Sequence, residues 1–150
     1  MTGPKEAIIG DAMLIRPCTP GEVSALVRLW RDAGTVATIG EDLPTLSGLV
    51  GRDDQPVLVA VDESGDVVGS LIIGWDGWRG HMYRMAVHPA HRRQGIALAL
   101  VREGEQRLRD RGARRIGAVV VAADPRATAF WIAAGYRPQV DMRRHVKDFT

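Results

Sequence analysis

The stretch best suited to chemistry begins where an apolar run stops at Pro89, crosses a basic loop at residues 92–95 and enters a helical pattern. This order predicts a strand, a loop and a helix N-terminus. The first N–H groups of a helix have no partner within it and lie at the positive end of its dipole, so they bind phosphates well. Arg92 and Arg93 add positive potential, and Gly95 has no side chain to keep an anion away. We therefore expect a site for a phosphate or pyrophosphate here.

The glycine of this loop is single and no Gly-Lys-Ser/Thr follows it, so neither a P-loop nor a dinucleotide fingerprint fits. The spacing Val87-x-Pro89-x-x-Arg92-x-x-Gly95-x-Ala97 instead resembles the acyl-CoA signature of the GNAT superfamily of N-acetyltransferases. The resemblance extends from about Met13 to the C-terminus.

This resemblance implies an α/β domain, classed as α+β in some schemes, that moves an acetyl group from acetyl-CoA to a primary amine. Its mixed central sheet would have six to seven strands, splayed between the central ones, and about four flanking helices. The residues implied to bind acetyl-CoA are Met85, Val87, Arg92, Arg93, Gln94, Gly95, Ile96, Ala97, Asp124 and Trp131.

Attack of an amine on a thioester needs a neutral amine, donors for the oxyanion and a proton for the leaving thiolate. The resemblance implies that the Met85 amide faces the acetyl carbonyl as oxyanion donor and that the Val87 backbone pairs with the pantetheine arm. A lysine-like amine has a pKa near ~10.4, so its proton needs an acceptor. His81 is a candidate base, and the acidic pair at residues 41–42 or a water chain are alternatives.

The expected acid is absent from its usual place. Residues 127–136 resemble the second motif of the family, with Asp124 for its asparagine and Tyr136 for its final phenylalanine. Trp131 stands where a tyrosine often protonates the thiolate, and an indole N–H is no practical acid. Tyr83 and Tyr136 are the candidate acids. The missing tyrosine also supports a second hypothesis, a catalytically silent acyl-CoA-binding or sensing module.

The acceptor side is harder to interpret. Glu41 and Asp42 are candidates for binding a cationic acceptor, or are loop charges with Asp42 capping a short helix. Trp75 and Trp78 line an aromatic acceptor pocket or pack over the sheet. The acyl chain length stays open, because four small residues leave room for a longer chain: Gly69, Ser70, Gly74 and Ala86.

Apolar periodicity and turn residues predict the elements that position these groups. Strands are expected at 13–16, 57–61, 67–74, 81–87 and 115–121, with a closing pair at 136–139 and 142–146. Helices are expected at 19–34, behind a Thr19–Glu22 capping box, and at 45–50, 95–111 and 124–135. Residues 1–12 read as a loosely attached tail before a single domain at 13–150.

Composition excludes several classes of protein. The 20 basic and 18 acidic residues give a net charge of +2, whereas a nucleic-acid-binding protein would concentrate more charge. Cys18 is the single cysteine, and the four histidines form no His-Glu-x-x-His pattern, so we expect neither a disulfide nor a metal site. No apolar run approaches the ~20 residues of a membrane helix. A cytoplasmic protein is expected, and the family suggests a homodimer.

Overall fold

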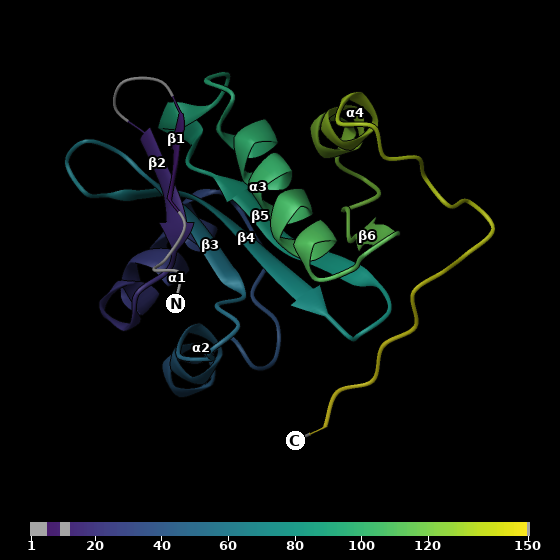
Figure 1. Cartoon of the computed structure of the whole chain (residues 1–150), viewed down its shortest axis with the longest axis horizontal. Helices are drawn as coiled ribbons and strands as arrows, with labels where there is room; N and C mark the ends of the chain where they lie inside the picture. Colours follow the sequence, from purple (N-terminus) through teal and green to yellow (C-terminus); the bar gives the residue numbers. More distant parts are fainter. Residues whose placement is uncertain (1–5, 10–12, 150) are drawn as a thin grey trace. The chain divides into compact units, whose positions relative to one another are not determined.

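The computed structural model describes residues 6–9 and 13–149, which fall into two compact units, Met1–Val119 and Val120–Thr150. The single domain at 13–150 therefore stays a prediction. The first unit holds the whole sheet, and the second holds one helix and the C-terminal segment (Figure 1).

One mixed sheet of six strands in chain order forms the first unit. All neighbours pair antiparallel except the last two, which are parallel. The strands are β1 (Ala7–Ile9), β2 (Met13–Pro17), β3 (Val57–Val61), β4 (Val67–Trp75), β5 (Gly80–Val87) and β6 (Ile116–Ala118). The predicted mixed α/β architecture is confirmed, with a strand count at the lower end of the expected range.

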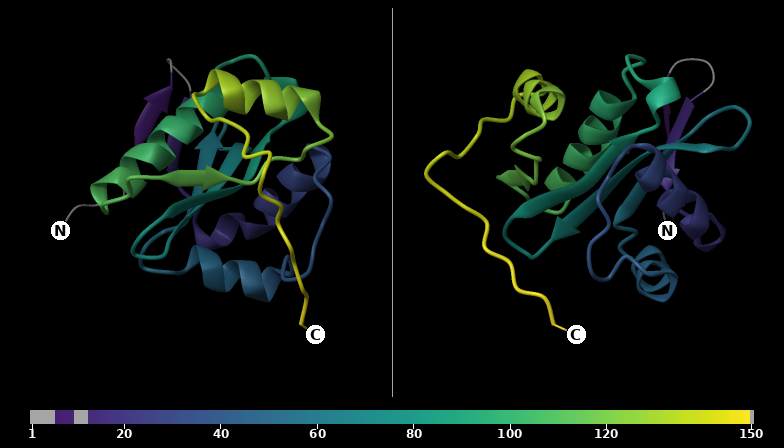
Figure 2. Two further views of the ribbon diagram at one scale, coloured as in Figure 1. Left: turned by 90° about the vertical axis from the view of Figure 1, so that its right-hand side faces the viewer. Right: turned by 180° about the vertical axis from the view of Figure 1, so that it is seen from behind.

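Helices cover both faces of this sheet (Figure 2). In the first unit, α3 (Ile96–Asp110) packs on one face, and α1 (Val23–Asp32) and α2 (Leu43–Val50) pack on the other. Two short 3-10 turns, η1 (Pro20–Glu22) and η2 (Pro89–His91), precede α1 and α3. The second unit contributes α4 (Pro125–Ala133).

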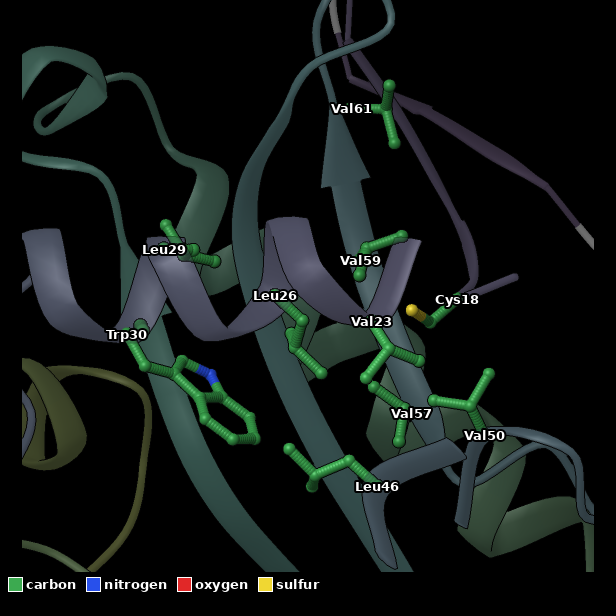
Figure 3. Close-up of a cluster of buried hydrophobic side chains, with 11 residues drawn as sticks. Cys18, Val23, Leu26, Leu29, Trp30, Leu46, Val50, Val57, Val59 and Val61 are labelled. Atoms are coloured by element: carbon green, nitrogen blue, oxygen red, sulfur yellow. The ribbon is translucent and has the colours of Figure 1, made fainter. Parts of the chain in front are cut away.

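Successive side chains of β4 point to opposite faces of the sheet, and each face has its own apolar core. Leu71 and Ile73 approach α3 at Gly104, whereas Ile72 between them packs with the cluster under α1 and α2, as the pleat requires. That cluster includes the apolar stripe of α1, with Leu26 and Trp30 at helical spacing (Figure 3). Because Leu26 is fully buried, its truncation to alanine would cost about 2–5 kcal/mol.

Close approach of α3 to the sheet depends on two glycines. A Cβ on Gly104 would lie 2.9 Å from the Met82 side chain, and one on Gly69 would lie 3.0 Å from Ile96. Space that the sequence left open at Gly69 for a longer acyl chain is therefore already filled by α3, so that part of the expectation is wrong.

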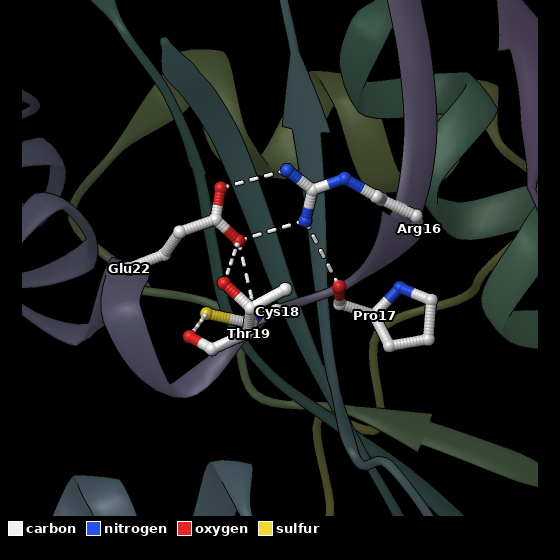
Figure 4. Close-up of polar contacts among 5 residues, drawn as sticks. All are labelled: Arg16, Pro17, Cys18, Thr19 and Glu22. Carbon is white, nitrogen blue, oxygen red and sulfur yellow. Dashed lines mark hydrogen bonds and ion pairs between the residues drawn. The ribbon is translucent and has the colours of Figure 1, made fainter. Parts of the chain in front are cut away.

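A polar cluster fixes the start of α1 (Figure 4). Both terminal nitrogens of Arg16 donate to the Glu22 carboxylate at 2.7 Å, and the Thr19 N–H donates to it at 3.0 Å, as the predicted capping box requires. The hydrogen bonds from Arg16 lower the pKa of Glu22 to about 2, and Glu22 in turn raises the pKa of Arg16.

Three regions differ from expectation. The buried strand predicted at 115–121 is only β6, because β5 offers it just three registered pairs, at Gly80, His81 and Met82. The closing strands at 136–139 and 142–146 are absent, since residues 137–149 form neither helix nor strand and the second unit contains no strand for them to pair with. Within the expected tail, β1 pairs with β2 from Ala7 to Ile9, while residues 1–5 and 10–12 lie outside the described residues.

Among the described residues, none of the helices combines the length and apolar character that spanning a bilayer requires. The same residues include no group of three or more side chains placed to hold a metal ion.

Candidate functional site

The splay between β5 and β6 creates the first feature of the site. Their parallel pairing ends at Met82, whose carbonyl accepts the Val119 N–H at 3.1 Å, yet β5 continues to Val87. Among the described residues of the first unit, none forms a strand partner for the backbone of residues 83–87 on this side. Met85 and Val87 lie in that free stretch, and both are half-buried. An unpaired buried backbone group costs about 1–3 kcal/mol, which favours a ligand as its partner.

A bulge distorts the same stretch on its β4 side. Tyr83 pairs with Ile72 and Ala86 with Ser70, so Arg84 and Met85 together oppose the single residue between those partners. Arg84 adopts φ 51°, in the left-handed region. Bulges re-aim backbone groups and are frequent beside active sites. No glycine marks this position, so no residue in the sequence predicts the bulge.

The N-terminus of α3 follows η2 after the loop at residues 92–95 and is open. Gly95 occupies the cap position with φ 78°, no side chain caps the helix, and helical bonding begins only where the Ala99 N–H donates to the Gly95 carbonyl at 3.0 Å. By contrast, Asp42 caps α2 through the Thr45 N–H at 2.8 Å, and Asp124 caps α4. The leading N–H groups of α3 are thus left for an anion.

Side chains around this N-terminus divide into two groups. Arg92, Arg93, Gln94 and Gly95 are exposed, with Arg93 at φ 64°. Ile96 is buried against Gly69, so only its backbone is open to a ligand, and Ala97 is half-buried. The predicted pyrophosphate loop is therefore an exposed, basic loop in front of uncapped N–H groups.

The second unit holds the remaining predicted donor-side residues. Asp124 accepts hydrogen bonds from the N–H groups of Arg126 at 3.0 Å and Ala127 at 3.1 Å. Trp131 is buried, and its ring meets Phe130 and Tyr136 edge to face at centroid distances of 5.4 and 4.9 Å. Trp131 and Tyr136 therefore belong to one aromatic cluster within this unit.

His81 and Tyr83 lie next to each other on the face of β5 opposite α3. Their rings are stacked with centroids 6.3 Å apart, and both approach the position of a Cβ on Gly74. His81 Nε2 lies 3.1 Å from an oxygen of Asp76, which comes from the β4–β5 turn. An imidazole held by a carboxylate at one nitrogen keeps the other nitrogen available as a base.

Asp76 is the residue that sequence reasoning missed. It accepts the N–H groups of Arg79 at 2.7 Å and Trp78 at 2.8 Å. The hydrogen bond from the Arg79 N–H, followed by that from His81, lowers the pKa of Asp76 to about 2, so the carboxylate is ionised at neutral pH. In the sequence, the Asp-Gly pair signalled only a turn.

The predicted acceptor residues are not brought together as one group. Glu41 pairs with Arg84, and Asp42 caps α2, the alternative that the sequence left open. Trp75 lies near Gly112 just beyond the end of α3, on the other face of the sheet from His81. Trp78 is exposed, with the Arg79 guanidinium 3.9 Å above its ring.

Comparisons with known proteins identify the family. The family model described as "Acetyltransferase (GNAT) family" matches residues 23–136. Acetyltransferase SG1711 of Sodalis glossinidius (strain morsitans) is 32% identical over 108 residues, which cover 72% of this chain and 75% of the relative.

Solved structures share the fold. Aminoglycoside antibiotic 6'-N-acetyltransferase AAC(6')-Ih from Acinetobacter baumannii superposes with a TM-score of 0.72 at 18% identity, over 92% of this chain and 99% of that one. Rv2747 from Mycobacterium tuberculosis, in complex with CoA and NLQ, superposes with a TM-score of 0.65 at 26% identity, over 81% of this chain and 69% of that one. Family model, relative and fold all agree, and this chain belongs to the acetyltransferase (GNAT) family.

Proposed function

We propose that the chain transfers an acetyl group from acetyl-CoA to a primary amine by direct attack of the amine on the thioester. The observation that carries the proposal is the order of two features along the chain, the free edge of β5 at residues 83–87 and then the uncapped N-terminus of α3. A thioester whose pantetheine arm leads to a diphosphate needs both features in this order.

Donor binding then depends mainly on the main chain. The first N–H groups of α3 hold the pyrophosphate, with positive charge from Arg92 and Arg93 and the neutral amide of Gln94 around it. The Val87 backbone pairs with the pantetheine arm, and the Met85 amide donates to the carbonyl oxygen as it becomes an oxyanion. One such donor is worth about 2.7–4 kcal/mol in the transition state.

His81 is the base in this proposal. Asp76 holds its Nε2, which leaves Nδ1 to take the proton of the attacking amine. The amine nitrogen then bonds to the carbonyl carbon and the C–S bond breaks. The thiolate takes a proton from a tyrosine, and because the chain has two, Tyr83 and Tyr136 are the candidates, which separate Tyr→Phe substitutions distinguish.

The test follows labelled acetyl-CoA in a size-fractionated cell extract, with the wild type, Gly95→Glu and Gly95→Asn. A carboxylate at residue 95 repels the pyrophosphate, whereas asparagine tolerates the left-handed backbone and adds no charge. A Cβ here meets nothing within 4 Å, so neither side chain clashes, but both substitutions strain the left-handed backbone, glutamate more than asparagine. We expect label on amines with the wild type, a small decrease with Gly95→Asn and a loss of about 100-fold with Gly95→Glu.

Each outcome distinguishes between hypotheses. Label in small molecules indicates a small amine acceptor, and label on proteins indicates a protein amino group. If the wild type binds acetyl-CoA but moves no more label than Gly95→Glu, the chain is instead the silent binding or sensing module that the tryptophan at 131 suggests. If the wild type does not bind acetyl-CoA, the proposal fails.

A homodimer and a cytoplasmic location stay predictions from the sequence. Exposed apolar side chains in the C-terminal segment support contact with a second copy: Val140, Met142, Val146 and Phe149. Light scattering on the purified chain measures the mass and tests the dimer.

A further inference from the structure

We propose that Arg84 is a positioning residue that holds residues 35–42, here called the acceptor segment, against β5 beside Met85. The acceptor segment connects α1 to α2 and carries Glu41. The part of this inference that concerns the acceptor rests on the proposed function. The mechanical part, that Arg84 fixes the segment, stands on the contacts alone.

The side chain of Arg84 reaches the segment at three points. Its Nη2 donates to the Val36 carbonyl at 3.1 Å and to the Thr38 hydroxyl at 3.3 Å, and its guanidinium pairs with the Glu41 carboxylate. Glu41 also accepts the N–H and the hydroxyl of Thr38, which closes the segment into a loop around the guanidinium. The side chains of Arg84 and Glu41 are only 20% and 14% exposed, so water screens the pair weakly.

The backbone of Arg84 is also held in place, by a hydrogen bond from Ser70 of β4. Its carbonyl accepts the Ser70 hydroxyl at 2.9 Å, and the Trp30 indole N–H donates to that hydroxyl at 2.9 Å. Ser70 is fully buried, and the Arg84 guanidinium lies 5.5 Å from the centroid of the Trp30 ring. The last turn of α1, the bulge and the acceptor segment are therefore joined through one residue.

This junction matters for the site because Arg84 directly precedes Met85 in the chain. The next residue, Met85, supplies the amide that we assign to the oxyanion, and the bulge at Arg84 sets its direction. Because the Glu41 charge is already matched by Arg84, Glu41 serves the acceptor by shaping the segment and does not supply a free anion. We therefore expect loss of the Arg84 side chain to affect acceptor binding and to leave the donor site intact.

The experiment uses Arg84→Gly, because glycine adopts the left-handed backbone freely and removes only the side chain. Arg84→Lys keeps the cation without the planar fork. Arg52→Gln is the matched control, since it breaks an exposed pair with Asp54, 2.8 Å apart, on a different loop. Amide hydrogen exchange of residues 35–42, the dissociation constant of acetyl-CoA and the KM for an accepted amine are measured for each.

We expect Arg84→Gly to speed exchange across the acceptor segment at least tenfold and to raise the amine KM about tenfold, with acetyl-CoA affinity within twofold of wild type. Glu41→Gln should have a similar effect, and the double variant little more, because both act through one contact. Arg84→Lys should recover part of the loss, and Arg52→Gln should change nothing.

Unchanged exchange in Arg84→Gly would overturn the inference, as would equal weakening of donor and acceptor binding. If the wild type acetylates no amine, the proposed function fails, yet faster exchange confined to residues 35–42 would still establish Arg84 as the residue that holds the segment. Additive effects of Arg84→Gly and Glu41→Gln would show that the two residues act separately and would also contradict it.

Discussion

The donor side and the acceptor side of this protein are built in different ways. On the donor side, the predicted ligand groups of the first unit are mainly backbone N–H and C=O groups of β5 and of the first turn of α3, and they lie within fifteen consecutive residues, 83–97. On the acceptor side, the proposed groups are side chains that a loop or turn brings to β5, such as Asp76 with His81 and Glu41 with Arg84.

This difference has a physical consequence. Backbone groups are fixed by secondary structure, so a substitution on the donor side acts mainly through charge or backbone conformation. Side chains that lie 40 or more residues apart in the sequence, such as Glu41 and Arg84, make contact only when several elements are correctly placed. The acceptor side can therefore change its chemistry through a few substitutions while the donor side stays intact.

The largest expected effect is at His81. We expect His81→Gln to lower kcat by about 10²–10⁴-fold, because it removes the proposed general base, and to leave acetyl-CoA affinity within twofold. Steady-state kinetics with a fixed amine and calorimetric binding of acetyl-CoA measure the two quantities. A parallel loss of donor affinity would show that the two sides are not separate.

Asp76→Asn is the companion variant for that comparison. Asp76 is ionised at neutral pH because its pKa lies at about 2, and asparagine keeps a side chain of the same size without the charge. Its kcat should fall less than that of His81→Gln, and in the double variant the loss should not exceed that of His81→Gln alone. Unchanged kcat in Asp76→Asn would mean that the 3.1 Å contact is only structural.

The Arg16–Glu22 ion pair belongs to neither the donor side nor the acceptor side. Its loss therefore measures how far a change in stability alone affects binding and activity. The folded-state pKa of Glu22, about 2, lies below its ordinary value of 4.5 because Arg16 donates two hydrogen bonds to it. A lowered carboxyl pKa stabilises the fold above pH 4.5, and this contribution is lost as the pH falls from about 4.5 to 2. Since water screens part of the pair, we expect Glu22→Gln to destabilise the protein by about 1–2 kcal/mol at pH 7.

Chemical denaturation of both proteins between pH 2 and 7 measures that difference. It should shrink toward zero near the pKa of Glu22, and both acetyl-CoA affinity and amine KM should be unchanged at pH 7. A difference that stays constant with pH would show that the ion pair contributes nothing to it.

The same contrast explains what the sequence predicted. The predicted pyrophosphate loop and the length of α3 followed from local patterns, since Pro89, Gly95 and an apolar period of 3.6 mark a strand, a loop and a helix within one short stretch. The mixed sheet followed from the family resemblance. The helix cap at Asp42 likewise needed only its neighbours.

Other features depended on tertiary context that no local pattern records. The bulge at Arg84 lacks glycine, and its left-handed backbone is held by Ser70 and the acceptor segment. In the sequence, Asp76 indicates only a turn, because its carboxylate meets His81 only after the β4–β5 hairpin has closed. The valine-rich run after β6 has strand propensity but no neighbouring strand, since β5 has already diverged.

The smallest expected effect concerns Trp131, the donor-side residue that departs most from the family motif. A tyrosine has the shape to keep the edge-to-face contacts with Phe130 and Tyr136, and its hydroxyl can protonate a thiolate where the indole cannot. We expect Trp131→Tyr to bind acetyl-CoA within twofold of wild type and to retain or raise kcat, as single-turnover and steady-state assays would show. Trp131→Phe is the control, because it keeps an aromatic ring without any donor. If Trp131→Tyr binds normally but turns over far more slowly, the indole N–H itself contributes to transfer, and the donor side depends on a side chain as strictly as the acceptor side does.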